Sequence, residues 1–304
     1  MDAKRARNSV GSRTMFHVRK ITSFGPHGLI GFVFFSMISL LAIFAPWIVP
    51  HDPFVIEATQ RLIPPAWMEG GSSTFLLGTD HLGRDIFSRL IYGSRISLLV
   101  GILAVVIAGV IGLFLGLISG YFGGSWIDQL IMRVVDAMLA IPTLLLVLVV
   151  VIVLEPGLAT LIFVIGITSW VQYTRIVRGE VLSIKERDFV RMAKTAGASN
   201  KHIIMKHILP NALSSFTVIA TIGVANAIMT ESSLSFLGLG VQSPDITWGS
   251  MLNDGKNYIA TSWWVATFPG IAITITVLSI TFMGDWLRDF LDPKLKKGGD
   301  TNET

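Results

Sequence analysis

The chain contains six long stretches in which apolar residues predominate. They lie at about residues 28–50, 95–119, 130–154, 157–175, 212–232 and 263–284. Because a helix rises about 1.5 Å per residue, about 20 apolar residues are needed to cross a hydrocarbon core of about 30 Å. Only 14% of the residues are charged, whereas soluble globular proteins carry about 25%. The sequence therefore predicts an all-α integral membrane protein with six transmembrane helices in a lipid bilayer.

The distribution of Lys and Arg predicts the orientation in the membrane. Basic residues gather in a leader at 1–27, in the segment 175–211 and in a tail at 286–304. A six-span arrangement puts these three regions on one side, and an excess of positive residues marks the cytoplasmic side. We therefore expect both termini in the cytoplasm. Topology explains the net charge of +4, so we expect no nucleic-acid partner.

The same pattern divides the chain into regions. The stretch 28–50 follows the basic leader but is too long for the core of a signal peptide, and no small-residue cleavage site follows it, which indicates an uncleaved membrane anchor. The segment 51–94 then forms a long extracytoplasmic loop. The remaining spans form a core at 95–285, which includes the basic loop 175–211.

Small residues recur at every fourth position of the second span. They are Ala104, Ala108, Gly112, Gly116 and Gly120. Residues at this spacing share one helix face, and small side chains there let a neighbouring backbone approach closely. The spacing predicts a helix-packing seam.

Several uncharged polar residues fall within predicted spans. Ser169 and Gln172 lie in the fourth span, and Asn226, Thr230 and Ser233 share one face of the fifth. Side chains of this kind can line a translocation path, and Ser169, Gln172, Asn226 and Thr230 are our candidates for one. Hydrogen bonds between helices explain the same residues equally well.

The third span carries two features of its own. Arg133 and Asp136 stand three residues apart near its start, a spacing that allows them to neutralise each other. We expect a structural ion pair rather than a transport role. Pro142 lies inside this span, where its missing amide donor predicts a kink.

Motifs of enzymes and metal sites are absent from the sequence. The chain has no cysteine, its histidines do not form the His-Glu-x-x-His pattern, and no Gly-x-Ser-x-Gly is present. The Gly-rich nucleotide-binding loop that ends in Gly-Lys and a hydroxyl residue is missing too. We therefore predict no catalytic residue, no metal ligand and no cofactor in this chain. Any ATP must be bound by another chain.

The basic loop 175–211 has the pattern of two short helices joined by a turn. Arg191 to Thr195 is expected to form a helix that Gly197 ends in a left-handed conformation. Ser199 can cap a second helix from about 200 to 209, which Pro210 is expected to stop or redirect. Such an elbow suits docking into a groove of a partner, although an ordinary solvated loop also fits this pattern.

The stretch RMAKTAGASNKHIIMKHILPNA, at 191–212, resembles the EAA loop of permease subunits in ATP-binding-cassette importers. Ala193, Gly197, Leu209 and Pro210 match the loop pattern in identity and spacing, whereas Arg191 and Met192 replace its Glu and first Ala. The resemblance implies that a coupling surface toward an ATPase is formed by Arg191, Met192, Ala193, Lys194, Ala196, Gly197, Ala198, Ser199, Leu209 and Pro210.

Two further stretches narrow the resemblance. LGTDHLGRDIFSRLIYGSRISL at 77–98 and SLSFLGLGVQSPDITWGSMLNDG at 233–255 look like hallmark segments of permeases in the dipeptide and oligopeptide (peptide/nickel) family, and the dipeptide C-type subunit is the type most resembled. The similarity covers about residues 28–297. It implies a type I importer permease fold with a cytoplasmic coupling helix, in a bacterial inner membrane.

The resemblance also implies partners. These are a second, homologous permease subunit, two ATPases that hold ATP and Mg²⁺, and an extracytoplasmic binding protein that delivers peptide. Related permeases for glutathione, nickel chelates or antimicrobial peptides would share this scaffold. A stand-alone secondary transporter would need paired broken helices and buried acidic residues, and an intramembrane enzyme would need a catalytic constellation.

Overall fold

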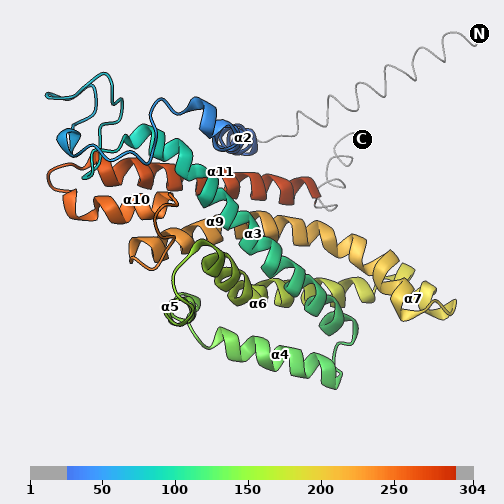
Figure 1. Ribbon diagram of the computed structural model, residues 1–304. Helices are drawn as coiled ribbons and strands as arrows, with labels where there is room; N and C mark the ends of the chain where they lie inside the picture. The colour runs from blue at the N-terminus through green and yellow to red at the C-terminus, as the bar shows by residue number, and fades with distance from the viewer. Residues whose placement is uncertain (1–25, 292–304) are drawn as a thin grey trace, which may run out of the picture.

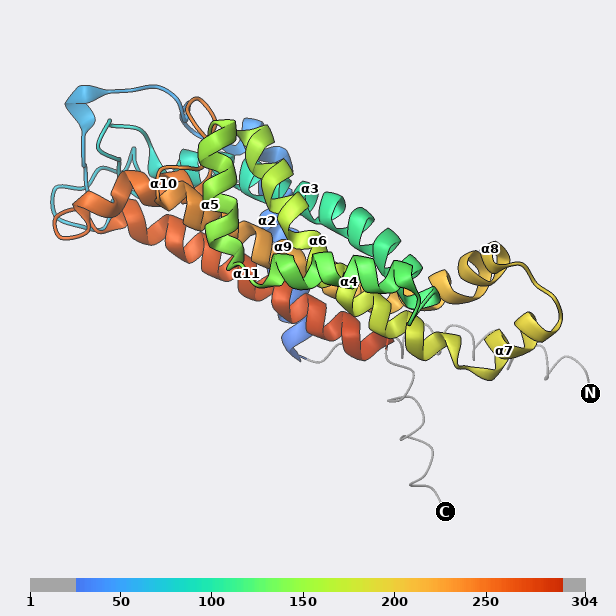
Figure 2. The ribbon, with the colours of Figure 1, turned by 90° about the horizontal axis from the view of Figure 1, so that it is seen from below.

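The computed structural model describes residues 26–291, which form a bundle of helices without strands (Figures 1 and 2). The helices are α2 (Pro26–Ile48), α3 (Ile86–Tyr121), α4 (Trp126–Leu139), α5 (Thr143–Leu154), α6 (Leu158–Lys185), α7 (Asp188–Thr195), α8 (Asn200–His202), α9 (Leu209–Phe236), α10 (Trp248–Gly255) and α11 (Trp264–Leu291). Two 3₁₀ turns lie at Ala58–Gln60 and Lys256–Tyr258. The leader and most of the predicted tail lie outside the described residues.

Five helices are long and apolar enough to cross a membrane, and α4 together with α5 makes a sixth candidate. Large apolar side chains such as Val110 and Phe114 of α3 and Ile43 of α2 are exposed on the outside of the bundle. Side chains of this kind suit contact with lipid tails rather than water. The predicted all-α membrane fold is confirmed.

The third span is not one continuous helix. It consists of α4 and α5, which meet at an angle of 85° around residues 140–142. Pro142 lacks an amide donor and restricts Ile141 before it to extended conformations, so the break is far sharper than the predicted kink. α3 and α6 run parallel, since Gly112, Gly116 and Gly120 face Tyr173, Val177 and Val181 in the same order. The chain must therefore cross back between them, through α4 and α5.

The helices around the basic loop are longer than the sequence suggested. α6 continues to Lys185 rather than ending near 175. At the other end of the loop, α8 joins α9 through a π-helical segment at Ile203–Ile208. Pro210 therefore does not stop the helix, contrary to our expectation. The wider π turn, in which the Leu209 amide donates to the Ile204 carbonyl, lets the helix continue past a residue that has no amide hydrogen.

The small-residue seam of α3 is confirmed. A Cβ atom added to Gly116 would lie 2.6 Å from Val177 Cβ, and one added to Gly120 would lie 2.6 Å from Val181 Cβ. Such distances are shorter than van der Waals contact, so only glycine fits at either position. The backbone of α3 thereby packs against side chains of α6 along the C-terminal half of α3, and we treat the two helices as one rigid unit.

The predicted ion pair between Arg133 and Asp136 is wrong. Both side chains are exposed, and the ion pairs among the described residues do not include this one. A charged pair three residues apart on a helix surface contributes only about 0.2–0.5 kcal/mol, which is little to hold the two side chains together. The ion pair that joins this span to α6 is formed by Asp128 of α4, whose side chain is 3% exposed. Its carboxylate accepts hydrogen bonds from the Arg178 guanidinium of α6 at 2.6 and 2.8 Å.

Ser119 and the Gly124 amide also donate to Asp128, so its carboxylate oxygens are well satisfied. Asp128 and Arg178 lie 50 residues apart in the sequence. The buried pair joins the α3–α4 turn to α6 near the end of the bundle that carries α7 and α8.

Candidate transport groove, elbow and outer pocket

The four predicted path residues line one cavity between α6 and α9. Ser169 and Gln172 reach it from α6, and Asn226 and Thr230 reach it from α9. The cavity has a volume of about 420 Å³, and residues of α3 and the first turn of α5 complete its wall. Sequence reasoning placed these residues on two separate helices, and the fold brings them together. We call this cavity the groove.

The wall of the groove combines apolar side chains with uncharged polar ones. Among the described residues that line it, none is Asp, Glu, Lys or Arg. The Thr230 hydroxyl donates to the Asn226 carbonyl of its own helix at 2.9 Å, and the described hydrogen bonds join neither Ser169 nor Gln172 to α9. The geometry therefore does not support the alternative interpretation, in which these residues form hydrogen bonds between α6 and α9.

Sequence reasoning missed Tyr173, which also lines the groove. Its side chain is buried, and its hydroxyl lies where a Cβ atom at Gly223 of α9 would be. Glycine at position 223 thus leaves room for a tyrosine from α6. Nothing in the sequence indicated this contact, because Tyr173 and Gly223 are 50 residues apart and neither belongs to a recognisable motif.

The elbow consists of α7, the turn at 196–199 and α8. Gly197 has φ = +81°, the left-handed conformation that favours glycine. The Gly197 amide donates to the Lys194 carbonyl at 3.1 Å, and the Ala198 amide donates to the Ala193 carbonyl at 3.1 Å. This is a Schellman ending. The predicted helix end at Gly197 is confirmed.

The second half of the elbow begins at Ser199, whose hydroxyl accepts from the His202 amide at 3.3 Å, so the predicted cap is confirmed. Met192 is 65% exposed, and Arg191 pairs with Glu186 at 2.5 Å on the surface. Ala193 and Leu209 instead pack partly buried against Val190 and Ile203.

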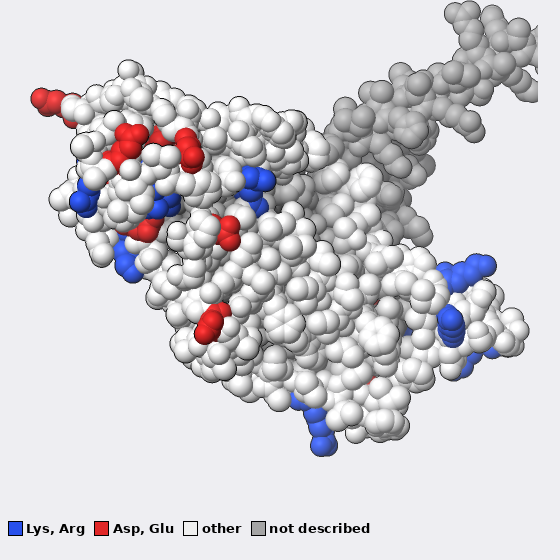
Figure 3. All heavy atoms as spheres, viewed as in Figure 1, with Lys and Arg blue, Asp and Glu red and all other residues white. Residues whose placement is uncertain are grey.

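The elbow projects from one end of the bundle, opposite α10 (Figure 2). Lys and Arg side chains stand out on this end, whereas acidic and basic side chains are mixed at the other (Figure 3). Most of the predicted coupling residues therefore lie on an exposed surface that carries basic side chains, whereas Ala193, Ala198 and Leu209 are partly buried beneath it.

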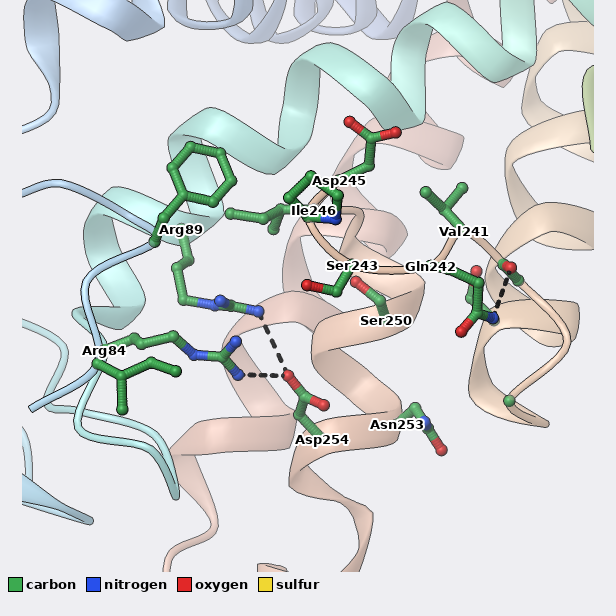
Figure 4. Close-up of a pocket in the computed structure, with 16 residues that line it drawn as sticks. Arg84, Arg89, Val241, Gln242, Ser243, Asp245, Ile246, Ser250, Asn253 and Asp254 are labelled. Atoms are coloured by element: carbon green, nitrogen blue, oxygen red, sulfur yellow. Dashed lines mark hydrogen bonds and ion pairs between the residues drawn. The ribbon is translucent and has the colours of Figure 1, made fainter. Parts of the chain in front are cut away.

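A pocket of about 350 Å³ lies at the opposite end, between the loop after α2 and the segment that leads into α10 (Figure 4). Arg84 and Arg89 both point toward Asp254, at 2.8 and 3.3 Å. Arg84 also pairs with Asp80 at 2.7 Å. The two contacts with Asp254 join the end of the loop and the first turn of α3 to α10 across 165 to 170 residues of sequence.

Asp80, His81 and Asp254 lie close enough to hold a metal ion. Both carboxylates, however, already face guanidinium groups, whose positive charge opposes a cation. The cluster is therefore better explained as a set of ion pairs that holds the loop against α10 than as a metal site.

Comparisons with known proteins agree with this architecture. A family model described as "Binding-protein-dependent transport system inner membrane component" matches residues 112–297, and one described as "N-terminal TM domain of oligopeptide transport permease C" matches residues 26–65. The inward-facing methionine ABC transporter MetNI is similar in fold, with a TM-score of 0.57 at 20% identity over 67% of this chain and 96% of that one. This likeness confirms the type I importer permease fold.

Curated relatives cover most of the chain. The Di/tripeptide transport system permease protein DppC of Pseudomonas aeruginosa is 46% identical over 88% of each chain. The Dipeptide transport system permease protein DppC of Escherichia coli is 48% identical over 88% of this chain and 89% of its own length. Because the family model matches more than half of this chain and these relatives are similar over most of it, the chain belongs to the family of binding-protein-dependent transport system inner membrane components.

Proposed function

We propose that this chain is one of two permease subunits in an ATP-driven importer of dipeptides and short oligopeptides. A homologous subunit would complete the membrane channel, two ATPases would bind ATP and Mg²⁺, and an extracytoplasmic protein would deliver the peptide. The termini and the elbow would lie in the cytoplasm. The observation that carries the proposal is the groove, which gathers Ser169, Gln172, Asn226 and Thr230 in a chain whose curated relatives are named as peptide permeases.

The chemistry of the groove fits passage of a peptide. Amide and hydroxyl side chains can exchange hydrogen bonds with a peptide backbone of any sequence, because every residue offers a donor and an acceptor. A wall without charged side chains gives the charged ends of the peptide no strong site to rest in. Selectivity would then lie mainly in the binding protein, and the groove would bind weakly enough to release its cargo.

The elbow provides the connection to the ATPases. Its exposed outer face, with Met192 as an apolar anchor surrounded by basic residues, suits insertion into a complementary groove. The tight packing of α3 on α6 and the Asp128–Arg178 pair would carry a displacement of the elbow into the bundle. ATP binding would draw the two elbows together and open the groove outward, and hydrolysis would reverse this as a rigid-body transition.

The coupling assignment is tested by Gly197→Asp. We expect this variant to insert into the membrane but to lose peptide uptake and co-purification of the ATPases, because a charged side chain would enter the docking surface. Gly238→Asp is the matched control. Gly238 has φ = +82°, like the +81° of Gly197, and a Cβ atom meets no heavy atom within 4 Å at either site. Gly238 lies at the opposite end, so this variant should retain the ATPases.

Equal loss of the ATPases from both variants would show that backbone strain, and not docking, is responsible. Normal uptake by Gly197→Asp would overturn the coupling assignment.

The groove is tested by Thr230→Leu, with Thr217→Leu as its control. Both threonines lie on α9 and donate to the carbonyl four residues earlier, at 2.9 and 2.7 Å, but only Thr230 lines the groove. We expect Thr230→Leu to lower the maximal rate of dipeptide uptake several-fold while the ATPases remain bound, and Thr217→Leu to transport normally. Equal uptake by the two variants would contradict the path assignment. Competition by glutathione or nickel chelates in the same assay distinguishes the related substrates.

A further inference from the structure

A separate cavity of about 500 Å³ lies where the end of α3 meets α6, α7 and α8. It is on the inner side of the elbow, away from the groove and from the outer pocket. Tyr121, Lys185, Glu186, Arg191, Lys194 and Asn200 contribute polar atoms to its wall. Arg191 and Lys194 of its wall also belong to the coupling surface of the elbow, but the transport function described above assigns no ligand to the cavity itself.

The cavity carries an excess of positive charge. Its wall holds three cations, Lys185, Arg191 and Lys194, against the single carboxylate of Glu186. Glu186 is paired with Arg191 at 2.5 Å, while the ion pairs of the described part of the chain include neither lysine. The pKa of Glu186 is lowered, first by the hydrogen bond from Arg191 and also by the charges of Arg191, Lys185 and Lys194.

Lys185 is held in position at the wall. Its Nζ donates to the Tyr121 carbonyl at 2.8 Å and lies 5.7 Å from the centre of the Tyr121 ring. The Tyr121 hydroxyl in turn donates to Asn200 Oδ1 at 2.6 Å. An ammonium group has three donors, so Lys185 retains donors for an anion after its bond to the carbonyl. The side chain is therefore oriented before any ligand arrives.

The cavity lies at a level where a membrane-spanning helix ends. α3 ends at Tyr121, and the next aromatic side chains, Phe122 and Trp126, are 38% and 72% exposed. Exposed aromatic residues at the end of a span typically mark the headgroup layer. Phe122 lines the cavity itself, so apolar and basic surfaces meet at its mouth. A phospholipid offers the complementary combination, with acyl chains close to a phosphate.

We propose that this cavity binds the phosphate of an anionic phospholipid, with Lys185 and Lys194 as the groups that recognise it. Basic pockets beside spanning helices on the cytoplasmic side are suited to such headgroups. The site rests on the chain being a membrane protein and is independent of the proposed substrate. Bound lipid would fill the space between the bundle and the elbow and would fix the position of the elbow relative to the bundle.

The test is native mass spectrometry of the full-length chain in detergent, titrated with dioleoyl phosphatidylglycerol, dioleoyl phosphatidylcholine or inorganic phosphate. We expect phosphatidylglycerol to bind about thirtyfold more tightly than phosphatidylcholine, as expected for two lysines near a headgroup. The double variant Lys185→Gln with Lys194→Gln should lose this preference. The matched control, Lys201→Gln with Lys206→Gln, removes the same charge from exposed lysines of the same region that do not line the cavity, and should retain it.

Equal affinity for the two lipids, or an equal loss from both double variants, would overturn the proposal, because general attraction to positive charge would then explain the binding. Displacement of phosphatidylglycerol by an equal concentration of inorganic phosphate would overturn the assignment to lipid in favour of a soluble phosphate. Circular dichroism checks that the variants are folded. If the double variant is unfolded, the exposed Lys194→Gln alone provides the test, with Lys201→Gln as its control.

Discussion

Gly116 lies in the tightest part of the contact between α3 and α6, and its replacement by alanine should destabilise the bundle. An added Cβ atom would be 2.6 Å from Val177 Cβ, 2.8 Å from Val177 Cγ1 and 2.9 Å from the Thr174 carbonyl oxygen. None of these atoms is the end of a flexible side chain, so one helix must move. Overpacking of this kind costs about 1–3 kcal/mol.

Gly179 provides the matched control, because it lies within α6 and a Cβ atom there meets no heavy atom within 4 Å. Replacing glycine by alanine inside a helix stabilises the helix by about 1 kcal/mol. This contribution is common to both variants and cancels in their comparison. Gly116→Ala should therefore be about 1–3 kcal/mol less stable than Gly179→Ala, which should equal or exceed the wild type.

The assay is unfolding of the full-length chain in dodecylmaltoside by added sodium dodecyl sulfate, followed by far-ultraviolet circular dichroism. Gly120→Ala, which would place a Cβ atom 2.6 Å from Val181 Cβ, should behave like Gly116→Ala. If Gly116→Ala and Gly179→Ala unfold at the same detergent fraction, α3 and α6 are not packed as tightly as described, and the rigid unit on which the coupling mechanism depends is refuted.

Two further changes test other parts of the fold. Asp128→Ala should destabilise the chain by about 3 kcal/mol in the same assay. This is the low end for a broken buried pair, because the remaining Arg178 is 28% exposed. Adding Arg178→Ala should recover part of the lost stability, and wild-type stability of Asp128→Ala alone would contradict the role of the pair. Ser199→Ala should destabilise the start of the helix at Asn200 by about 1 kcal/mol, seen as faster amide hydrogen exchange at residues 201–204, and unchanged exchange would show that the cap contributes nothing.

Local patterns predicted the features that depend on near neighbours in the sequence. The helix end at Gly197, the cap at Ser199 and the small face of α3 were all predicted, because each follows from the conformation or size of the residues themselves. The polar faces of α6 and α9 were also visible in the sequence. That they enclose a common groove was not, because helical periodicity says which residues share a face but not which faces meet.

The incorrect or incomplete predictions also have physical causes. Arg133 and Asp136 have suitable spacing, yet both are exposed and the described ion pairs do not join them. Asp128 instead pairs with Arg178, which is 50 residues away. Pro142 signalled a bend, but the residue type alone gave no angle, and α4 and α5 meet at 85°. Pro210 signalled a stop, but a π-helical turn allowed the helix to continue.

The sequence by itself determined that this chain lies in a membrane, which stretches are candidate spans and which loop forms the elbow. These properties depend on hydrophobicity and on backbone preferences, which are carried by short stretches of residues. Only the tertiary structure decided that Ser169 and Thr230 line one groove, that Arg84 and Arg89 meet Asp254, and that Lys185 and Lys194 share a cavity. Each of these depends on the packing of helices that are distant in sequence, and packing is a property of the whole bundle.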